Sequence, residues 1–218
     1  MKKINIKLLI VTSLLTMMPI PIGLLLWNKL PERLATHFGV NGLAYGFSSK
    51  AEAVLWEPMI MLGLHIFAVV MTSFDPKAKN VSPKIRKIVY WLVPVFSVLV
   101  QMLVYGNAIG LIHNNNQIGG ILIGGVFIVL GNYLPKTKLN YTIGIRLPWT
   151  LDNEENWNKT HRLAGKLWVV GGLVLLFSSF VSWTVPYIAG IVLVSIILIP
   201  YLYSYWLSRM GQAHTKQK

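Results

Sequence analysis

The feature that most constrains this chain is a series of six apolar segments, each close to the length that crosses a bilayer. A membrane-spanning helix needs about 20 mostly apolar residues. The six segments cover residues 8–27, 54–74, 88–112, 118–134, 167–185 and 188–207. Because backbone groups in hydrocarbon must be hydrogen-bonded internally, and strong barrel-type alternation is absent, each segment is predicted to be a helix. The predicted fold is all-α, a polytopic transmembrane bundle of six spans.

Composition supports a bilayer as the solvent of these segments. Apolar residues make up 54% of the 218 residues and charged residues only 12%, which is about half of the charged share of a soluble domain. The chain contains no cysteine, which excludes thiolate zinc sites, iron–sulfur clusters and cysteine nucleophiles. No cofactor is expected.

Lysine and arginine are distributed unevenly about the six spans. Seventeen of the 20 fall on one side, and only Lys29, Arg33 and Lys50 fall on the other. Cytoplasmic loops carry the excess of positive charge, so both termini are predicted to be cytoplasmic in a multi-pass protein of the bacterial cell membrane. The net charge of +13 is attributed to this asymmetry beside an anionic leaflet, and no direct nucleic-acid partner is predicted.

The predicted outer loop, residues 28–53, belongs to an amino-terminal membrane half over residues 1–112. It interleaves aromatic side chains with glycines, which permit tight turns. Two interpretations are open: a folded cap on the helix bundle, or a recognition surface for a molecule outside the cell. The candidate recognition residues are His37, Phe38, Gly39, Gly42, Tyr45 and Phe47.

The predicted inner loop, residues 135–166, belongs to a carboxyl-terminal membrane half over residues 113–218. Within it, Asp152 and Glu155 fit a capping box. This pattern predicts a helix that opens near Asn153 and continues into the fifth span.

The same loop is rich in tryptophan and arginine. Trp149 and Trp157 are placed as aromatic residues of a membrane interface would be. One interpretation is an amphipathic helix that lies on the inner membrane surface. The other is a docking or sensing role, in which Arg146 and Arg162 bind lipid phosphate or an acidic partner.

Polar residues near the spans allow a different class of function. Ionisable groups inside a membrane are functional candidates, so His37, His65 and Glu57 could serve a membrane-embedded enzyme or a small-solute transporter. His37 and nearby acidic residues are metal-ligating types, but HExxH or HxH spacing is absent, so no metal site is predicted. No hydrolase motif is present, and no catalytic residue is assigned.

The inner segment 131–168 resembles the signature region of the bacterial SdpI family of integral membrane proteins. The outer segment 30–50 is similar to the uncharacterised membrane domain that is often fused to it. The matching inner positions are Gly131, Asn132, Pro135, Asn140, Gly144, Arg146, Pro148, Trp149, Thr150, Trp157, Thr160, His161 and Gly165. The matching outer positions are Leu30, Pro31, His37, Phe38, Gly42 and Lys50.

The resemblance implies a binding protein, not an enzyme. Family members are regarded as conferring resistance to a secreted, membrane-active peptide toxin, so a peptide toxin and the lipid bilayer are the expected partners. The typical member also transduces a signal by drawing a cytoplasmic transcriptional repressor to the membrane. The outer loop would then recognise the toxin, and the inner loop would relay its presence.

Overall fold

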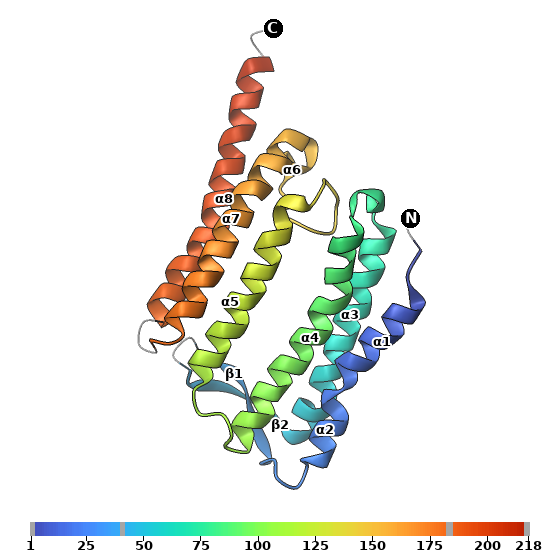
Figure 1. The fold of residues 1–218 in the computed structure, drawn as a ribbon, viewed down its shortest axis with the longest axis vertical. Helices are drawn as coiled ribbons and strands as arrows, with labels where there is room; N and C mark the ends of the chain where they lie inside the picture. The colour runs from blue at the N-terminus through green and yellow to red at the C-terminus, as the bar shows by residue number, and fades with distance from the viewer. Residues whose placement is uncertain (1–2, 40–41, 182–184, 216–218) are drawn as a thin grey trace. The chain divides into compact units, whose positions relative to one another are not determined.

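The computed structural model describes residues 3–39, 42–181 and 185–215. Within these residues six helical stretches are long and apolar enough to cross a membrane (Figure 1): Ile6–Leu25, Glu52–Phe74, Pro83–Ala108, Gln117–Lys136, Glu154–Ser178 and Tyr187–Met210. The predicted all-α fold with six spans is confirmed, apart from one small sheet described below. The cytoplasmic placement of both termini stays a prediction.

The chain divides into two compact units. The amino-terminal unit contains Lys2–Phe74 and Pro83–Gly119, and the carboxyl-terminal unit contains Asp75–Ser82 and Gly120–Lys218. The segment Asp75–Ser82 therefore packs with the second unit, although the helices on both sides of it belong to the first. The division into functional halves at residue 112 stays a prediction.

In the amino-terminal unit three helical spans pack against one another, and both polar and apolar side chains are buried between them. The elements are α1 (Ile6–Met17), α2 (Pro19–Leu25), β1 (Arg33–Phe38), β2 (Ala44–Ser49), a π-helical turn (Glu52–Trp56), α3 (Glu57–Phe74) and α4 (Pro83–Ala108). The first span is interrupted at Pro19, because proline has no N–H to continue the helical ladder. Helices α1, α3 and α4 contact one another pairwise.

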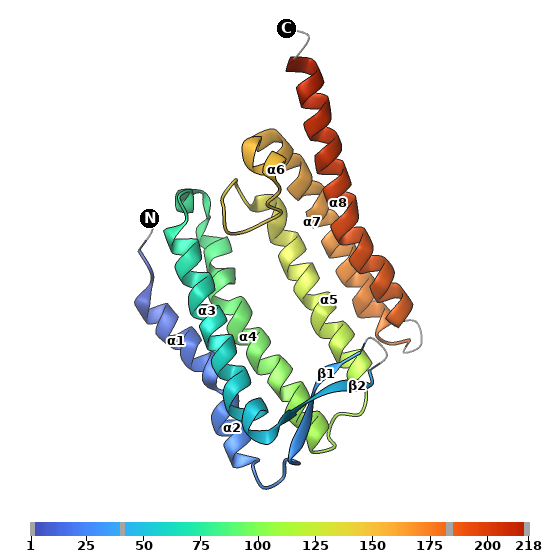
Figure 2. The same ribbon diagram turned by 180° about the vertical axis from the view of Figure 1, so that it is seen from behind.

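The 28–53 loop folds as an antiparallel β-hairpin, which the sequence interpretation did not anticipate (Figure 2). Its two six-residue strands pair Arg33 with Ser49 at one end and Phe38 with Ala44 at the other. Gly42 adopts φ of 75°, and its N–H donates to the Gly39 carbonyl at 2.8 Å. Glycine tolerates this left-handed conformation without steric cost, which explains its place in the turn.

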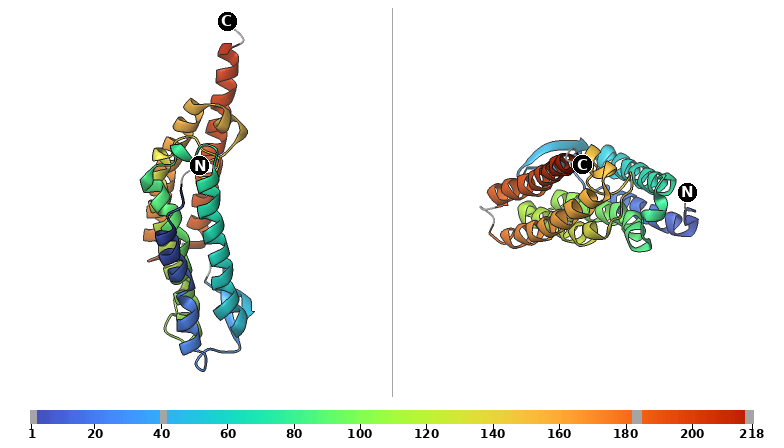
Figure 3. Two further views of the ribbon diagram at one scale, coloured as in Figure 1. Left: turned by 90° about the vertical axis from the view of Figure 1, so that its right-hand side faces the viewer. Right: turned by 90° about the horizontal axis from the view of Figure 1, so that it is seen from above.

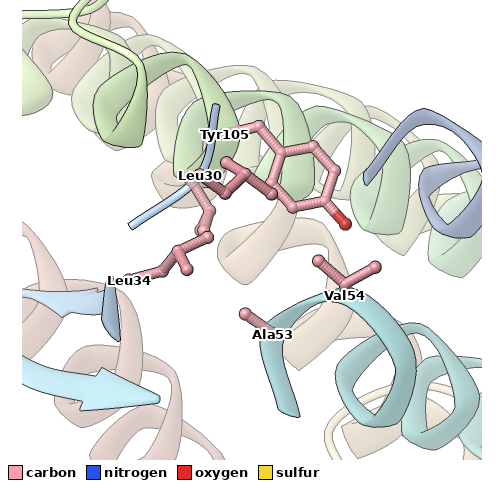
Figure 4. Packing of buried hydrophobic residues seen from close by; sticks show 6 residues of the cluster. Leu30, Leu34, Ala53, Val54 and Tyr105 are labelled. Atoms are coloured by element: carbon pink, nitrogen blue, oxygen red, sulfur yellow. The ribbon is translucent and has the colours of Figure 1, made fainter. Parts of the chain in front are cut away.

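A cluster of buried side chains fastens the base of the hairpin to the helices. Leu34 of β1 is fully buried with Leu30, Ala53, Val54 and Tyr105 (Figure 4). These residues come from the hairpin, the π-helical turn and α4. Removing a leucine side chain from solvent contributes about 1.5–3 kcal/mol, so Leu34 alone is a substantial anchor for β1.

The carboxyl-terminal unit contains the remaining helices and a long polar loop. Its elements are a 3₁₀ turn (Ala78–Asn80), α5 (Asn115–Tyr133, whose first turn belongs to the other unit), a 3₁₀ turn (Leu134–Lys136), α6 (Pro148–Asp152), α7 (Glu154–Ser178) and α8 (Val185–Thr215). Helix α8 packs along α7 and continues past α6 (Figure 3).

Helix α7 opens close to the predicted position. The cap is Asn153, whose side chain accepts the N–H of Asn156 at 2.9 Å. The predicted capping box placed this role on Asp152, one residue too early. Glu155 forms an i,i+4 ion pair with Lys159 instead, at 2.7 Å. The helix then runs without a break into the fifth span, as predicted.

Glycines bring α5 and α7 into close contact. A Cβ atom at Gly124 would lie 2.7 Å from the Gly172 carbonyl oxygen, and one at Gly172 would lie 2.6 Å from the Gly124 carbonyl oxygen. Gly131 and Gly165 face each other in the same way farther along. Small residues allow helix backbones to approach inside membranes, and this approach places the end of α5 beside the middle of α7.

Candidate functional site

The hairpin exposes one aromatic face. Tyr45 is 73% exposed and Phe47 is 52% exposed, and alternate residues of β2 share this orientation. The exposed His37 ring lies 6.2 Å from the Tyr45 ring, centroid to centroid. Gly46 lies beneath it, since a Cβ there would come within 2.8 Å of the His37 Cβ. Tyr45 and Phe47 therefore share one exposed face of β2, whereas His37 projects from the face on which Gly46 lies.

The other three candidates lie at the turn of the hairpin. Phe38 and Gly39 are partly buried. The Gly42 carbonyl oxygen accepts the Asn115 side-chain amide at 3.4 Å, which ties the turn to the start of α5. These residues shape the backbone of the turn, whereas the exposed rings lie on β2 and at His37. That any of them contacts a toxin stays a prediction.

A chain of hydrogen bonds links the hairpin to α3. His37 Nδ1 lies 3.1 Å from Thr36 Oγ1, which lies 3.0 Å from Ser48 Oγ. Ser48 Oγ in turn donates to Glu57 Oε1 at 3.1 Å. Two hydroxyl groups thus join His37 to Glu57, the first residue of α3. The hairpin is attached to this helix by polar contacts, whereas Leu34 anchors it to the π-helical turn and α4.

Of the three residues of the enzyme or transporter hypothesis, His37 and Glu57 are joined through the two hydroxyl groups, but His65 lies apart from them. His65 is fully buried, and its Nε2 lies 2.9 Å from Thr12 Oγ1 of α1. It lies eight residues along α3 from Glu57, which is about 12 Å at the helical rise. Among the described residues, no group of three histidine or acidic side chains could hold a metal ion.

The carboxyl-terminal unit holds a buried stack of Trp157 on His161. The two rings are 4.0 Å apart with an interplanar angle of 22°, and both side chains are at most 1% exposed. Trp157 Nε1 donates to the Thr137 carbonyl at 2.7 Å. The expected interfacial position of Trp157 is therefore wrong, because the preceding loop folds over its ring and accepts its N–H.

His161 fixes the loop through both ring nitrogens. Nδ1 donates to the Trp157 carbonyl at 2.7 Å, and Nε2 accepts the Ile145 N–H at 2.9 Å. An acceptor at Nε2 means that the ring is neutral and carries its proton on Nδ1. Gly144, with φ of 120°, passes so close that a Cβ would collide with His161 Nε2. Only glycine fits this position.

Asn140 organises the middle of the loop from inside. Its Nδ2 donates to the carbonyls of Lys138 and Ile143 at 2.9 and 3.0 Å. Its Oδ1 accepts the N–H groups of Thr142 and Ile143 at 2.9 and 2.7 Å. Both donors and the acceptor of the amide are used, so this fully buried side chain replaces missing backbone pairing.

Asp75 joins this loop from the connection between α3 and α4. Its carboxylate is 2% exposed and accepts the N–H groups of Lys77 and Tyr141 at 2.7 and 2.8 Å. It also accepts the Thr142 hydroxyl at 2.8 Å. Nearby, Asn80 Nδ2 donates to the Leu139 carbonyl at 2.6 Å. The connection and the loop are therefore one folded structure.

Thr150 closes the end of the loop. Its hydroxyl lies 2.9 Å from the carbonyl oxygens of both Ile145 and Leu147, and it accepts the Leu147 N–H at 2.8 Å. Thr150 is fully buried. It thereby holds the backbone before Pro148 in the turn that starts α6.

A second polar chain joins α6, α7 and α8. Trp149 Nε1 donates to Ser204 Oγ at 2.8 Å. Ser204 Oγ donates to Asn156 Oδ1 at 2.7 Å, and Thr160 Oγ1 donates to the same oxygen at 2.9 Å. The Trp149 ring also meets the edges of Tyr201 and Tyr205. The first turns of α7 are therefore packed against α8 and do not form a separate surface helix.

The signature residues fall into three groups by exposure. The buried ones are Asn140, Thr150, Trp157, Thr160 and His161, the partly buried ones are Gly144 and Trp149, and the exposed ones are Asn132, Pro135, Arg146 and Pro148. The buried and partly buried members hold the loop together. Arg146 donates from Nη1 to the Tyr141 carbonyl at 2.7 Å, so its exposed guanidinium is held at the loop surface.

Sequence reasoning missed Asp75, Asn156 and Ser204. Asp75 did carry a signal, because it is the only acidic residue beside five cations in the connection between the second and third spans. Asn156 adjoins the recognised Trp157 but shows no motif of its own. Ser204 lies in an apolar span, and nothing in the sequence marks it.

The six spans define a multi-pass helical membrane protein, which carries a folded hairpin between its first and second spans and a polar loop with a buried interior after its fourth. Residues 136–204 match the model of the SdpI/YfhL protein family, and residues 14–62 match that of a domain of unknown function, DUF1648. The carboxyl-terminal part of the chain thus matches the family that its inner motif resembles, and the amino-terminal part matches the second domain.

The chain is also similar to a characterised relative over most of its length. It is 29% identical over 204 residues to the immunity protein SdpI of Bacillus subtilis (strain 168), in an alignment that covers 91% of this chain and 90% of that protein. No solved structure matches the chain significantly.

Proposed function

We propose that this chain is an immunity protein, which protects the cell that makes it from a secreted, membrane-active peptide toxin. The observation that carries the proposal is the similarity to the immunity protein SdpI, because it extends over nine-tenths of both chains. The proposed action is binding without catalysis. His65 lies apart from His37 and Glu57, which meet only through two hydroxyl groups, and this arrangement favours no enzyme or transporter mechanism.

The hairpin is the proposed toxin-contact surface. Tyr45 and Phe47 present apolar rings to the surroundings, and such rings supply large contact areas to an amphipathic peptide. Charge contributes little to recognition here, because Lys50 is paired with Glu32 at 2.8 Å. Recognition therefore depends on ring contacts and on the shape of the turn.

The 135–166 loop is the proposed relay to the cytoplasm. In this second role, toxin binding changes the loop so that a cytoplasmic transcriptional repressor is held at the membrane. The exposed Arg146 is the proposed contact for an acidic group of that partner, since a guanidinium forms two parallel bonds with a carboxylate.

Deletion of the gene tests the protective role directly. Deletion cells and complemented cells are challenged with a panel of membrane-active peptide toxins. We expect the deletion to sensitise the cells to at least one peptide and complementation to restore survival. Equal survival of both strains against every peptide that kills related cells would contradict the proposal.

The absence of cysteine makes the orientation easy to test. A membrane-impermeant maleimide has no background target in this chain, so Tyr45→Cys should be labelled in intact cells. Arg146→Cys should be labelled only after the membrane is opened. Labelling of both variants from the same side would contradict a hairpin outside and a loop inside.

A further inference from the structure

The segment Asp75–Ser82 belongs to a different unit from the two helices that it connects. It follows α3 directly and precedes α4, and both helices belong to the amino-terminal unit. The segment itself groups with the carboxyl-terminal unit. One peptide bond, between Phe74 and Asp75, joins the last residue of α3 to this segment.

Asp75 is attached to the loop more strongly than an ordinary turn residue. Its buried carboxylate accepts two backbone N–H groups and one hydroxyl within 2.8 Å. Neither of the two ion pairs found among the described residues includes it. Hydrogen bonds to a charged group are about twice as strong as neutral ones, and they are what compensates the burial of this charge.

This arrangement does not form a cation site. The donors already occupy both carboxylate oxygens, and the neighbouring Asn140 Oδ1 accepts two N–H groups and lies 3.2 Å from the Thr142 hydroxyl. Lys77 Nζ lies 5.1 Å above the Tyr141 ring, which adds a contact between the connection and the loop. The chemistry is that of a structural connection that holds Tyr141 and Thr142 in place.

The opposite end of α3 is bonded to the hairpin. Glu57, its first residue, accepts the Ser48 hydroxyl of β2 at 3.1 Å. One uninterrupted helix of 18 residues thus begins at the proposed toxin-contact element and ends one residue before Asp75. A helix of this length is about 27 Å long, which is close to the thickness of a hydrocarbon core.

We propose that Asp75 is a positioning residue that couples the hairpin to the signature loop through α3. In the resting protein its hydrogen bonds hold residues 139–142 closed. Displacement of α3 from the hairpin end breaks these bonds and releases the loop for its cytoplasmic partner. This inference rests on the relay role proposed above, but its test needs neither a toxin nor a repressor.

The test measures how often the loop opens. Leu139 is 6% exposed, so the thiol of a Leu139→Cys variant should react slowly with maleimide in opened membranes. Adding Asp75→Asn places an amide N–H against the Tyr141 N–H. We expect the labelling rate to rise about tenfold or more, because this is the fold-change that corresponds to losing hydrogen bonds to a charged carboxylate.

Two controls separate positioning from general instability. Asp152→Asn makes the same chemical change at an exposed position near the same loop and should leave the labelling rate unchanged. Leu34→Cys, fully buried in the other unit, should stay slow to label when Asp75→Asn is added. An equal rise at Leu34→Cys, or no rise at Leu139→Cys, would overturn the positioning role.

The coupling along α3 is tested from its other end. Ser48→Ala removes the hydroxyl that bonds Glu57 and leaves the loop untouched. We expect it to raise the labelling rate of Leu139→Cys by a smaller factor than Asp75→Asn does, and to have no further effect once Asp75→Asn is present. An unchanged rate in Ser48→Ala would overturn the coupling, whatever the toxin-challenge experiment shows for the immunity role.

Discussion

The hairpin and the 135–166 loop are both rich in aromatic and polar residues, yet they use them in opposite ways. The hairpin exposes Tyr45 and Phe47 and buries Leu34 at its base. The loop buries Trp157 and His161 and keeps Arg146 at its surface. Aromatic side chains therefore form an exposed surface in the hairpin and stabilise the interior of the loop. Only their burial, which the sequence does not show, distinguishes the two roles.

The two regions should differ most in the stability that is lost when an aromatic side chain is removed from each. Trp157→Ala leaves a cavity against His161 and an unpaired Thr137 carbonyl, so we expect a loss of about 3–5 kcal/mol in the free energy of unfolding. Phe47→Ala, at an exposed position, should change it by no more than about 0.5 kcal/mol. Thermal denaturation in detergent, followed by far-UV circular dichroism, measures both. Equal losses would contradict the contrast.

Glycine substitution should sharpen the same contrast within the carboxyl-terminal unit. Gly144→Ala combines a positive φ with a collision at His161, and we expect it to cost about 1–3 kcal/mol. Gly125→Ala in α5 meets no atom within 4 Å and should be neutral or stabilising by up to about 1 kcal/mol. The same melting experiment distinguishes them, and a harmless Gly144→Ala would show that the loop is not closely packed on His161.

Thr150 tests whether hydrogen bonds, and not shape alone, hold the loop. Thr150→Val keeps the volume but loses the hydroxyl that bonds Ile145 and Leu147, so we expect a cost of about 1–2 kcal/mol. Thr150→Ser keeps the hydroxyl and should lie much closer to the wild type. If both variants melt together, the bonds of Thr150 contribute nothing measurable.

The smallest effect is expected at the surface of α7. Lys159 pairs with Glu155 at 2.7 Å, but both side chains are well exposed. Exposed ion pairs of this kind contribute little to stability, and salt weakens them further. Lys159→Ala should therefore be almost indistinguishable from the wild type in melting experiments at 0.15 M salt, and a loss comparable to that of Thr150→Val would contradict this assignment.

Sequence patterns predicted the spans well because membrane insertion depends on length and hydropathy alone. They did not predict the hairpin, because strands of only six residues leave a weak local pattern. Leu34 in addition owes its position to contacts with distant residues. They identified Trp157 and His161 but not their burial, because Trp at a span end fits an interface equally well. Ser204 and Asn156 could not be found, as only the packing of α8 on α7 gives them partners.

The same limit applies to Asp75. It stands beside five cations in the sequence, a setting in which an ion pair is the natural expectation. The structure satisfies it with backbone N–H groups and a hydroxyl instead, which depends on how the distant residues 141 and 142 fold. Long-range pairings of this kind leave no trace in the local sequence.

The most direct measurement compares protection with stability for the exposed rings of the hairpin. Cells lacking the gene carry the wild type, the Tyr45→Ala/Phe47→Ala double variant or Lys159→Ala, and each is challenged with the peptide that kills the deletion strain. At equal protein amounts in the membrane and equal melting temperatures, we expect the double variant to lose protection and Lys159→Ala to retain it. Full protection by a stable double variant would contradict recognition by the hairpin.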